Sequence, residues 1–141
     1  MTISPPDMNE INKKIVEEFR ANGGTVEMFK GLKILLMHHK GAKSGKAYLN
    51  PLAYLPVGES MAVFASMGGA PNNPDWYHNL VANPDVQVEL GDGKTINAKA
   101  RVATGAEHDD LYAKQVAVAP MFGDYQKRTT RVIPVVVLER A

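Results

Sequence analysis

The chain has 141 residues, a length typical of one domain, and its 16 basic and 15 acidic side chains leave a formal net charge of +1. This balance does not indicate a nucleic acid or another strongly charged partner. The absence of cysteine excludes disulfides, cysteine-ligated metals and a cysteine nucleophile. No apolar run approaches the ~20 residues of a membrane span, and the first residues lack the pattern of a signal peptide. We therefore expect a cytoplasmic protein.

The N-terminal part is predicted to be an amphipathic helix over residues 5–19, with Asp7 or Asn9 as its cap. Its apolar face carries Ile11, Ile15, Val16 and Phe19. The flanking charges have mixed signs, which favours packing against the rest of the protein or a partner subunit over a membrane surface. Membrane association through this helix, and a homodimer, remain open alternatives. Residues 1–24 are expected to form this segment ahead of a core over residues 32–141.

The remaining chain alternates strand-like segments with turn signals. Six segments have the apolar runs or alternation of β-strands, at residues 32–39, 47–56, 61–65, 86–90, 95–103 and 131–139. Helices are predicted over residues 74–82, capped by Asn73, and over 105–118, capped by Thr104, while 119–130 is expected to be irregular. Strands joined mostly by hairpins indicate a mainly β (α+β) fold. We predict a six-stranded antiparallel barrel with peripheral helices, because closure removes exposed edges.

Three segments carry residues suited to ligand binding. Residues 40–46 place three lysines, a serine and two glycines in a turn, where amides and lysines can hold an anion, although a solvated basic turn explains them equally. Residues 66–80 follow a strand with a glycine pair and the only tryptophan, which suits a planar ligand, or a connector with Trp76 in the core. Residues 121–126 can cover a pocket, or Phe122 can fill the core.

Two other classes of chemistry have no pattern to support them. The histidines at positions 38, 39, 78 and 108 have no metal-ligand spacing, so no metal site is expected. Ser44 and Ser66 do not lie in the G-x-S-x-G elbow of a hydrolase.

Taken in order, these segments resemble the deazaflavin (F420)-dependent nitroreductase family of actinobacteria. The similarity covers residues 32–140 and is carried by several pieces: Gly41-Ala42-Lys43-Ser44-Gly45, Asn50-Pro51-Leu52, Ala65-Ser66-Met67-Gly68-Gly69, Asn73-Pro74-Asp75-Trp76-Tyr77-His78-Asn79-Leu80, Ala82-Asn83-Pro84, Asp124-Tyr125-Gln126 and Arg131-Val132-Ile133-Pro134-Val135-Val136. The resemblance implies a split β-barrel of the FMN-binding type and coenzyme F420 as the cofactor.

The resemblance also implies roles for particular residues. Lys43 and Ser44 would hold the phosphate and lactyl tail of the cofactor. The deazaflavin would lie along Pro51, Leu52, Ala65, Ser66, Met67, Gly68 and Gly69, with Trp76, Tyr77, Asn79 and Leu80 completing the groove. The reduced cofactor would give a hydride to a quinone, a nitroaromatic compound or a conjugated enone or lactone such as a coumarin. Tyr125, Ser66 or water would then supply a proton, and Tyr125 is the first choice.

The chain departs from the family pattern at four positions. Ala42 stands where the family usually has arginine, and Tyr48 replaces a second basic residue, so tail binding is expected to depend on the lysines of residues 40–46. Met67 replaces a common lysine. Phe122 stands where nitroimidazole-activating members tend to have tyrosine, which argues against efficient activation of such compounds. The alternatives are an FMN-dependent reductase or haem protein of the same fold, and a deazaflavin-binding protein without catalysis.

Overall fold

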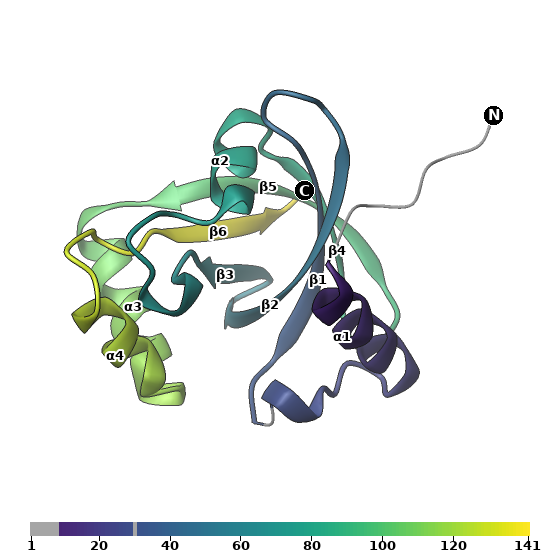
Figure 1. The fold of residues 1–141 in the computed structure, drawn as a ribbon, viewed down its shortest axis with the longest axis horizontal. Coiled ribbons are helices and arrows are strands. Elements are labelled where there is room, and N and C mark those ends of the chain that lie inside the picture. The colour runs from purple at the N-terminus through teal and green to yellow at the C-terminus, as the bar shows by residue number, and fades with distance from the viewer. Residues whose placement is uncertain (1–8, 30) are drawn as a thin grey trace.

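A computed structural model describes residues 9–29 and 31–141 of the chain. Six antiparallel strands close into a barrel in the order β1-β2-β3-β6-β5-β4 (Figure 1). The strands are β1 (Ile34–Lys40), β2 (Ala47–Val57), β3 (Ser60–Phe64), β4 (Asp85–Glu89), β5 (Thr95–Ala103) and β6 (Val135–Arg140). The helices are α1 (Glu10–Ala21), α2 (Asp75–Ala82), α3 (Gly105–Val118) and α4 (Met121–Lys127), with short 3-10 turns η1 (Glu27–Phe29) and η2 (Met67–Gly69). The predicted six-stranded barrel with peripheral helices is confirmed.

Barrel closure depends on β6, which lies between β3 and β5. Val136 of β6 is opposite Val63 of β3 and Val102 of β5. This last strand begins at Val135, four residues later than the predicted start at Arg131. Ala65 N–H donates to the Pro134 carbonyl at 3.0 Å. The rest of residues 131–134 makes no strand pairing with β3. The side chains of that segment contact loops instead, as described below.

The helix α1 covers one side of the barrel. Ile15, Val16 and Phe19 are buried in one cluster with core residues of β1 and β2. Ile11 is 64% exposed, so the predicted apolar face is narrower than expected. Asn9 caps the helix, because its Oδ1 accepts the N–H of Asn12 at 2.8 Å. Asp7 and the first four residues of the predicted helix lie outside the described residues.

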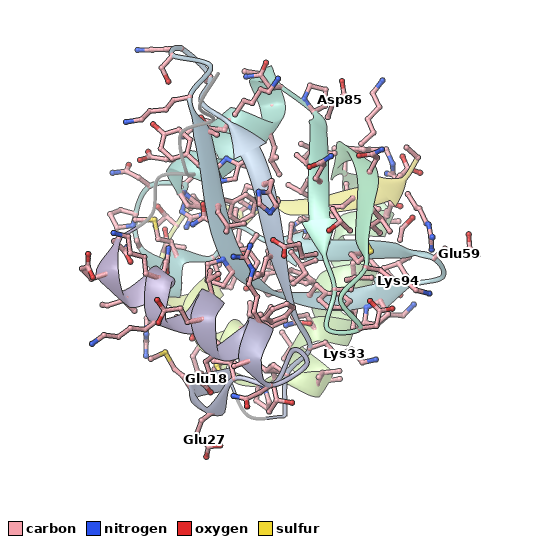
Figure 2. All side chains as sticks on the ribbon, turned by 90° about the vertical axis from the view of Figure 1, so that its right-hand side faces the viewer. Glu18, Glu27, Lys33, Glu59, Asp85 and Lys94 are labelled. Carbon is pink, nitrogen blue, oxygen red and sulfur yellow. The ribbon has the colours of Figure 1, made fainter. Side chains whose placement is uncertain are left out.

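Hydrogen bonds hold the 3-10 turn η1 and the turn between β4 and β5 in place. Glu27 N–H donates to Glu18 Oε2 at 2.5 Å, which ties η1 back to α1, and Figure 2 shows the two residues at the same edge of the molecule. Figure 2 also shows Lys94 at the turn between β4 and β5, where Leu90 N–H donates to the Lys94 carbonyl at 3.0 Å. Within the described residues, no helix is long and apolar enough to cross a membrane.

Two sequence-based predictions about helices are wrong. The segment expected to be irregular contains α4, whose Phe122 packs edge-on against Phe64 with ring centroids 5.7 Å apart. Gly123 lowers the helical propensity there, and α4 is held by packing of Phe122 in one cluster with Phe64 and Val116. The second error concerns the caps. Helix α2 begins at Asp75 without a side-chain cap from Asn73, and Thr104 is at the N-cap position of α3 but makes no side-chain cap hydrogen bond.

Candidate functional site

A cleft of about 1430 Å³ opens on one side of the barrel. Its walls come from the β1–β2 turn, the half-buried strand β2, the turn at η2, the start of α2, and α4, and Asn12, Phe29 and Leu32 line the part next to α1. The volume exceeds the ~300–1000 Å³ of an ordinary ligand pocket. Most of the residues implied by the family resemblance line it: Lys43, Ser44, Pro51, Leu52, Ser66, Met67, Gly68, Trp76, Asn79 and Tyr125.

The other implied residues do not line the cleft. Ala65 and Leu80 are buried in the barrel core, and Tyr77 packs against that core. Gly69 lies behind the wall, where a Cβ would meet the Tyr125 carbonyl oxygen at 2.7 Å. Trp76 belongs to both the core and the cleft: its side chain is only 7% exposed, and it also lines the cleft. These residues can support the wall, but the cleft itself is built from their neighbours.

The basic turn at the end of β1 is closed by its own hydrogen bonds. Gly41 N–H donates to the Lys46 carbonyl at 2.8 Å, and Gly45 N–H donates to the Gly41 carbonyl at 3.0 Å. Ala42 N–H donates to Asn79 Oδ1 at 2.9 Å. Within the part of the chain that the structure describes, this leaves the amides of Lys43 and Ser44 without a protein acceptor. An anion at this turn would therefore meet two amides and the Lys43 ammonium, a smaller set than the sequence suggested.

A buried polar network that sequence reasoning missed holds this turn against α2. His39 is 4% exposed, and its Nε2 lies 2.7 Å from Asn50 Oδ1, while its Nδ1 lies 3.3 Å from Asn79 Nδ2. Because Asn79 Oδ1 already accepts the Ala42 amide, Asn79 Nδ2 must donate to His39 Nδ1. His39 is therefore neutral with its proton on Nε2, and burial lowers its pKa from the ordinary value.

This network changes what two residues contribute to the site. Both polar atoms of the Asn79 side chain are engaged by the protein, so Asn79 shapes the cleft by fixing the turn. Tyr48, where the resemblance led us to expect a basic residue, stacks on His39 with ring centroids 5.7 Å apart. The sequence signal for this arrangement was weak, because adjacent histidines in a strand only indicate that one of them faces inward.

The opposite wall is formed by η2 and α4. Met67 has φ +46° and is 56% exposed on the cleft, and Gly68 and Gly69 also have positive φ. The Tyr125 ring is edge-on to Phe122 at 5.2 Å, and the Arg128 guanidinium carbon lies 5.7 Å from the Tyr125 ring centroid. Phe122 is buried and lines the cleft, so both sequence-based interpretations of this residue hold. A tyrosine and a strained turn thus face the same space.

The barrel topology and this cleft define a split-barrel protein with a large ligand-binding cleft on one side, and comparisons with known proteins identify its family. A family model described as F420H(2)-dependent quinone reductase matches residues 11–140, so the chain belongs to this family of F420-dependent oxidoreductases. A quinone reductase of this type from Mycobacterium tuberculosis H37Rv is 40% identical over 111 residues, covering 75% of this chain and 72% of the relative. The resemblance found in the sequence is confirmed.

Solved structures agree with this family and its fold. A structure of an F420-H2-dependent reductase, FDR-A, is 39% identical, with a TM-score of 0.69 over 75% of this chain and 93% of that chain. A structure described as a domain-swapped dimer is 35% identical, with a TM-score of 0.71 over 90% and 96% of the two chains. HutZ, a haem storage protein of Vibrio cholerae, shares only the fold, at 14% identity with a TM-score of 0.58 over 92% and 90%.

Proposed function

We propose that the protein binds F420H2 in this cleft and reduces a quinone or another electron-poor planar acceptor beside it. One observation carries the proposal: a single cleft joins a basic turn, an apolar strand face and a glycine turn that lie far apart in the sequence. The chemistry of the walls fits the cofactor, because a phosphate tail suits lysine and free amides, and a tricyclic ring suits a flat apolar wall.

The tail would bind at the β1–β2 turn. Lys43 and Ser44 line the cleft there, and their amides have no acceptor among the described residues. Ala42 in this turn and Tyr48 beside it add no charge to it. Lysine is a point charge without the fork of arginine, so tail binding here would rest on charge attraction more than on bidentate hydrogen bonds.

The ring would lie between two walls, with the face of β2 at Pro51 and Leu52 on one side and the η2 turn on the other. When bound, the reduced deazaflavin supplies a hydride from its ring carbon. The chain orients the ring, excludes water with Trp76 and Phe122, and offers a proton from Tyr125 or Ser66. Tyr125 is the first choice because its phenol lines the cleft from α4, on the side opposite β2.

The acceptor would occupy the part of the cleft next to α1. Asn12, Phe29 and Leu32 line this part, beyond the residues assigned to the cofactor. Two exposed methionines, Met67 and Met121, also line the cleft, and flexible thioether side chains adapt to ligands of different shape. This favours apolar planar acceptors, among them quinones, nitroaromatic compounds and coumarin-type lactones.

A fluorescence titration with F420 tests binding, and the oxidation of F420H2 by menadione, a coumarin and a nitroaromatic compound tests turnover. We expect saturable binding and the fastest oxidation with menadione. A protein that neither binds F420 nor oxidises F420H2 contradicts the proposal. Isolation with a normal flavin spectrum would support the FMN alternative, and tight binding without turnover would support a carrier.

We also propose that the protein forms a homodimer. The support is the relative described as a domain-swapped dimer, which matches 90% of this chain. Light scattering of the purified protein should give about twice the 15.4 kDa mass of the chain. A monomer mass across the accessible concentration range would contradict this.

A further inference from the structure

The side chain of Arg131 lies directly behind the η2 wall of the cleft. Its guanidinium donates four hydrogen bonds, all to one nine-residue stretch: Nε to the Ala70 carbonyl at 2.9 Å, Nη1 to the Ala65 carbonyl at 3.1 Å and to Asn73 Oδ1 at 2.7 Å, and Nη2 to the Ser66 carbonyl at 2.9 Å. Arg131 does not itself line the cleft. It therefore contacts the wall from the side that faces the protein.

These bonds set the direction of two peptide groups. In a trans peptide the carbonyl and the following N–H point in opposite directions. Because the Ala65 and Ser66 carbonyls point at Arg131, the N–H groups of Ser66 and Met67 point away from it. Ser66 and Met67 line the cleft, and neither amide has an acceptor in the described part of the chain. Arg131 thus leaves two free donors on the ligand side of the wall.

The conformation of this wall needs such support. Met67 is the non-glycine residue with positive φ in the described part of the chain, and Gly68 and Gly69 continue the left-handed backbone. A strained turn of this kind persists only where its surroundings over-determine it. Two weaker elements assist: the turn's own bonds from Gly69 and Ala70 N–H, and a 3.4 Å contact from Arg128 Nη1 to the Gly68 carbonyl.

The charge of Arg131 has no structural counter-ion to explain it. Its acceptors are carbonyls and one amide, and none of the described carboxylates pairs with it. Arg131 is only partly buried, and this burial lowers its pKa below the ordinary value. Because no described carboxylate competes for the guanidinium, its four hydrogen bonds all go to residues 65–73.

We propose that Arg131 is a positioning residue for the cofactor: it fixes residues 65–73 so that the Ser66 and Met67 amides face an electron-rich oxygen of the bound ring. This inference rests on the proposed cofactor position in the cleft. The planar fork of Arg131 does the positioning, and its positive charge draws electron density toward the same wall. Lysine at this position would keep the charge and lose the fork, since it cannot reach four separate acceptors at once.

Three variants test the proposal: Arg131→Gln removes the charge and most donors, Arg131→Lys keeps only the charge, and Arg128→Gln is the matched control. In the cofactor-free protein, we expect the Gly69 and Ala70 amides to exchange with solvent at least about tenfold faster in both Arg131 variants. The same amides should change less in Arg128→Gln, which loses only the 3.4 Å contact with the Gly68 carbonyl, and amides of the barrel strands should be unchanged in all three. Exchange is measured by NMR, so this readout does not depend on cofactor binding.

The second readout is affinity for F420, measured by fluorescence. We expect Arg131→Gln and Arg131→Lys to weaken binding by about tenfold or more, which corresponds to about 1.4 kcal/mol or more, and Arg128→Gln to change it less than about twofold. If Arg131→Gln does not fold, Asn73→Ala removes one acceptor and should give the same changes on a smaller scale. Unchanged exchange at Gly69 and Ala70, or full recovery by Arg131→Lys, would overturn the proposal. Failure of the unaltered protein to bind F420 would instead refute the proposed function.

Discussion

The replacement of Asn79 by alanine tests whether the buried network around His39 stabilises the protein and holds the Lys43 turn in place. The substitution leaves the Ala42 N–H and His39 Nδ1 without partners. Ala42 is exposed, so water can solvate its amide and the loss should be about 1 kcal/mol. His39 is buried, so its orphaned nitrogen should cost about 1–2 kcal/mol more. We expect the free energy of unfolding to fall by about 2–3 kcal/mol in total.

Urea unfolding provides the assay, because Trp76 is the only tryptophan and its burial in the core makes its fluorescence a reporter of the barrel. The control is Asn83→Ala, since Asn83 Nδ2 reaches the carbonyls of Lys40 and Gly41 of the same segment only at 3.5 and 3.3 Å. This control should lose less than about 1 kcal/mol with the same m-value. Equal losses in the two variants would refute the argument that the His39 network holds the turn. Asn79→Ala should also weaken F420 binding, because the Lys43 turn is released from α2.

The other predictions concern the same two walls. The buried His39 has a lowered pKa, so below the unfolded value of 6.5 the unfolded chain binds more protons than the native one. The free energy of unfolding should therefore be highest above that pH and fall as the pH drops below it. In urea titrations, His39→Gln should make the free energy of unfolding less dependent on pH. An unchanged pH dependence in this variant would contradict the proposed role of the His39 network. Gly69→Ala should destabilise the protein by about 2–4 kcal/mol, because its Cβ would meet the Tyr125 carbonyl oxygen at 2.7 Å and its φ is +84°. Gly68→Ala has open space around its Cβ and should cost only about 1 kcal/mol, so thermal unfolding that ranks the two equally would count against this packing. Lys43→Ala should weaken F420 binding about tenfold at low salt and less at high salt, while leaving the unfolding curve unchanged; a salt-independent effect would argue against charge attraction.

Much of the barrel could be predicted because strand signals are local. The period-two pattern of Val86, Val88 and Leu90, followed by two glycines in a tight turn, defines a hairpin without knowledge of any distant residue. The α4 helix was not predicted, because the contacts that stabilise it are with other parts of the chain. Its local propensity is weakened by Gly123, and only contacts with Phe64 and Val116 reveal why the chain is helical there.

The candidate site could likewise be predicted only in part. The order of motifs around Lys43, Ser66 and Tyr125 indicated which segments would form the cleft, and all three residues line it. The same order did not show which neighbours face the ligand. Gly69 and Leu80 belong to motif segments, yet they support the wall from behind, because successive positions of a helical turn point in different directions.

The sequence by itself determined the six strands, the hairpins, the family and the segments that meet at the cleft, because these depend on short-range patterns and on ordered motifs. Only the tertiary structure decided how the walls are held. Arg131 is bonded to acceptors from Ala65 to Asn73, and His39 links Asn50 to Asn79, across sequence separations that no local pattern encodes. A hydrogen bond needs its partners at about 3 Å with the right orientation. The pairing of β3 with β6 and the packing of α2 on β1 bring these groups to that distance.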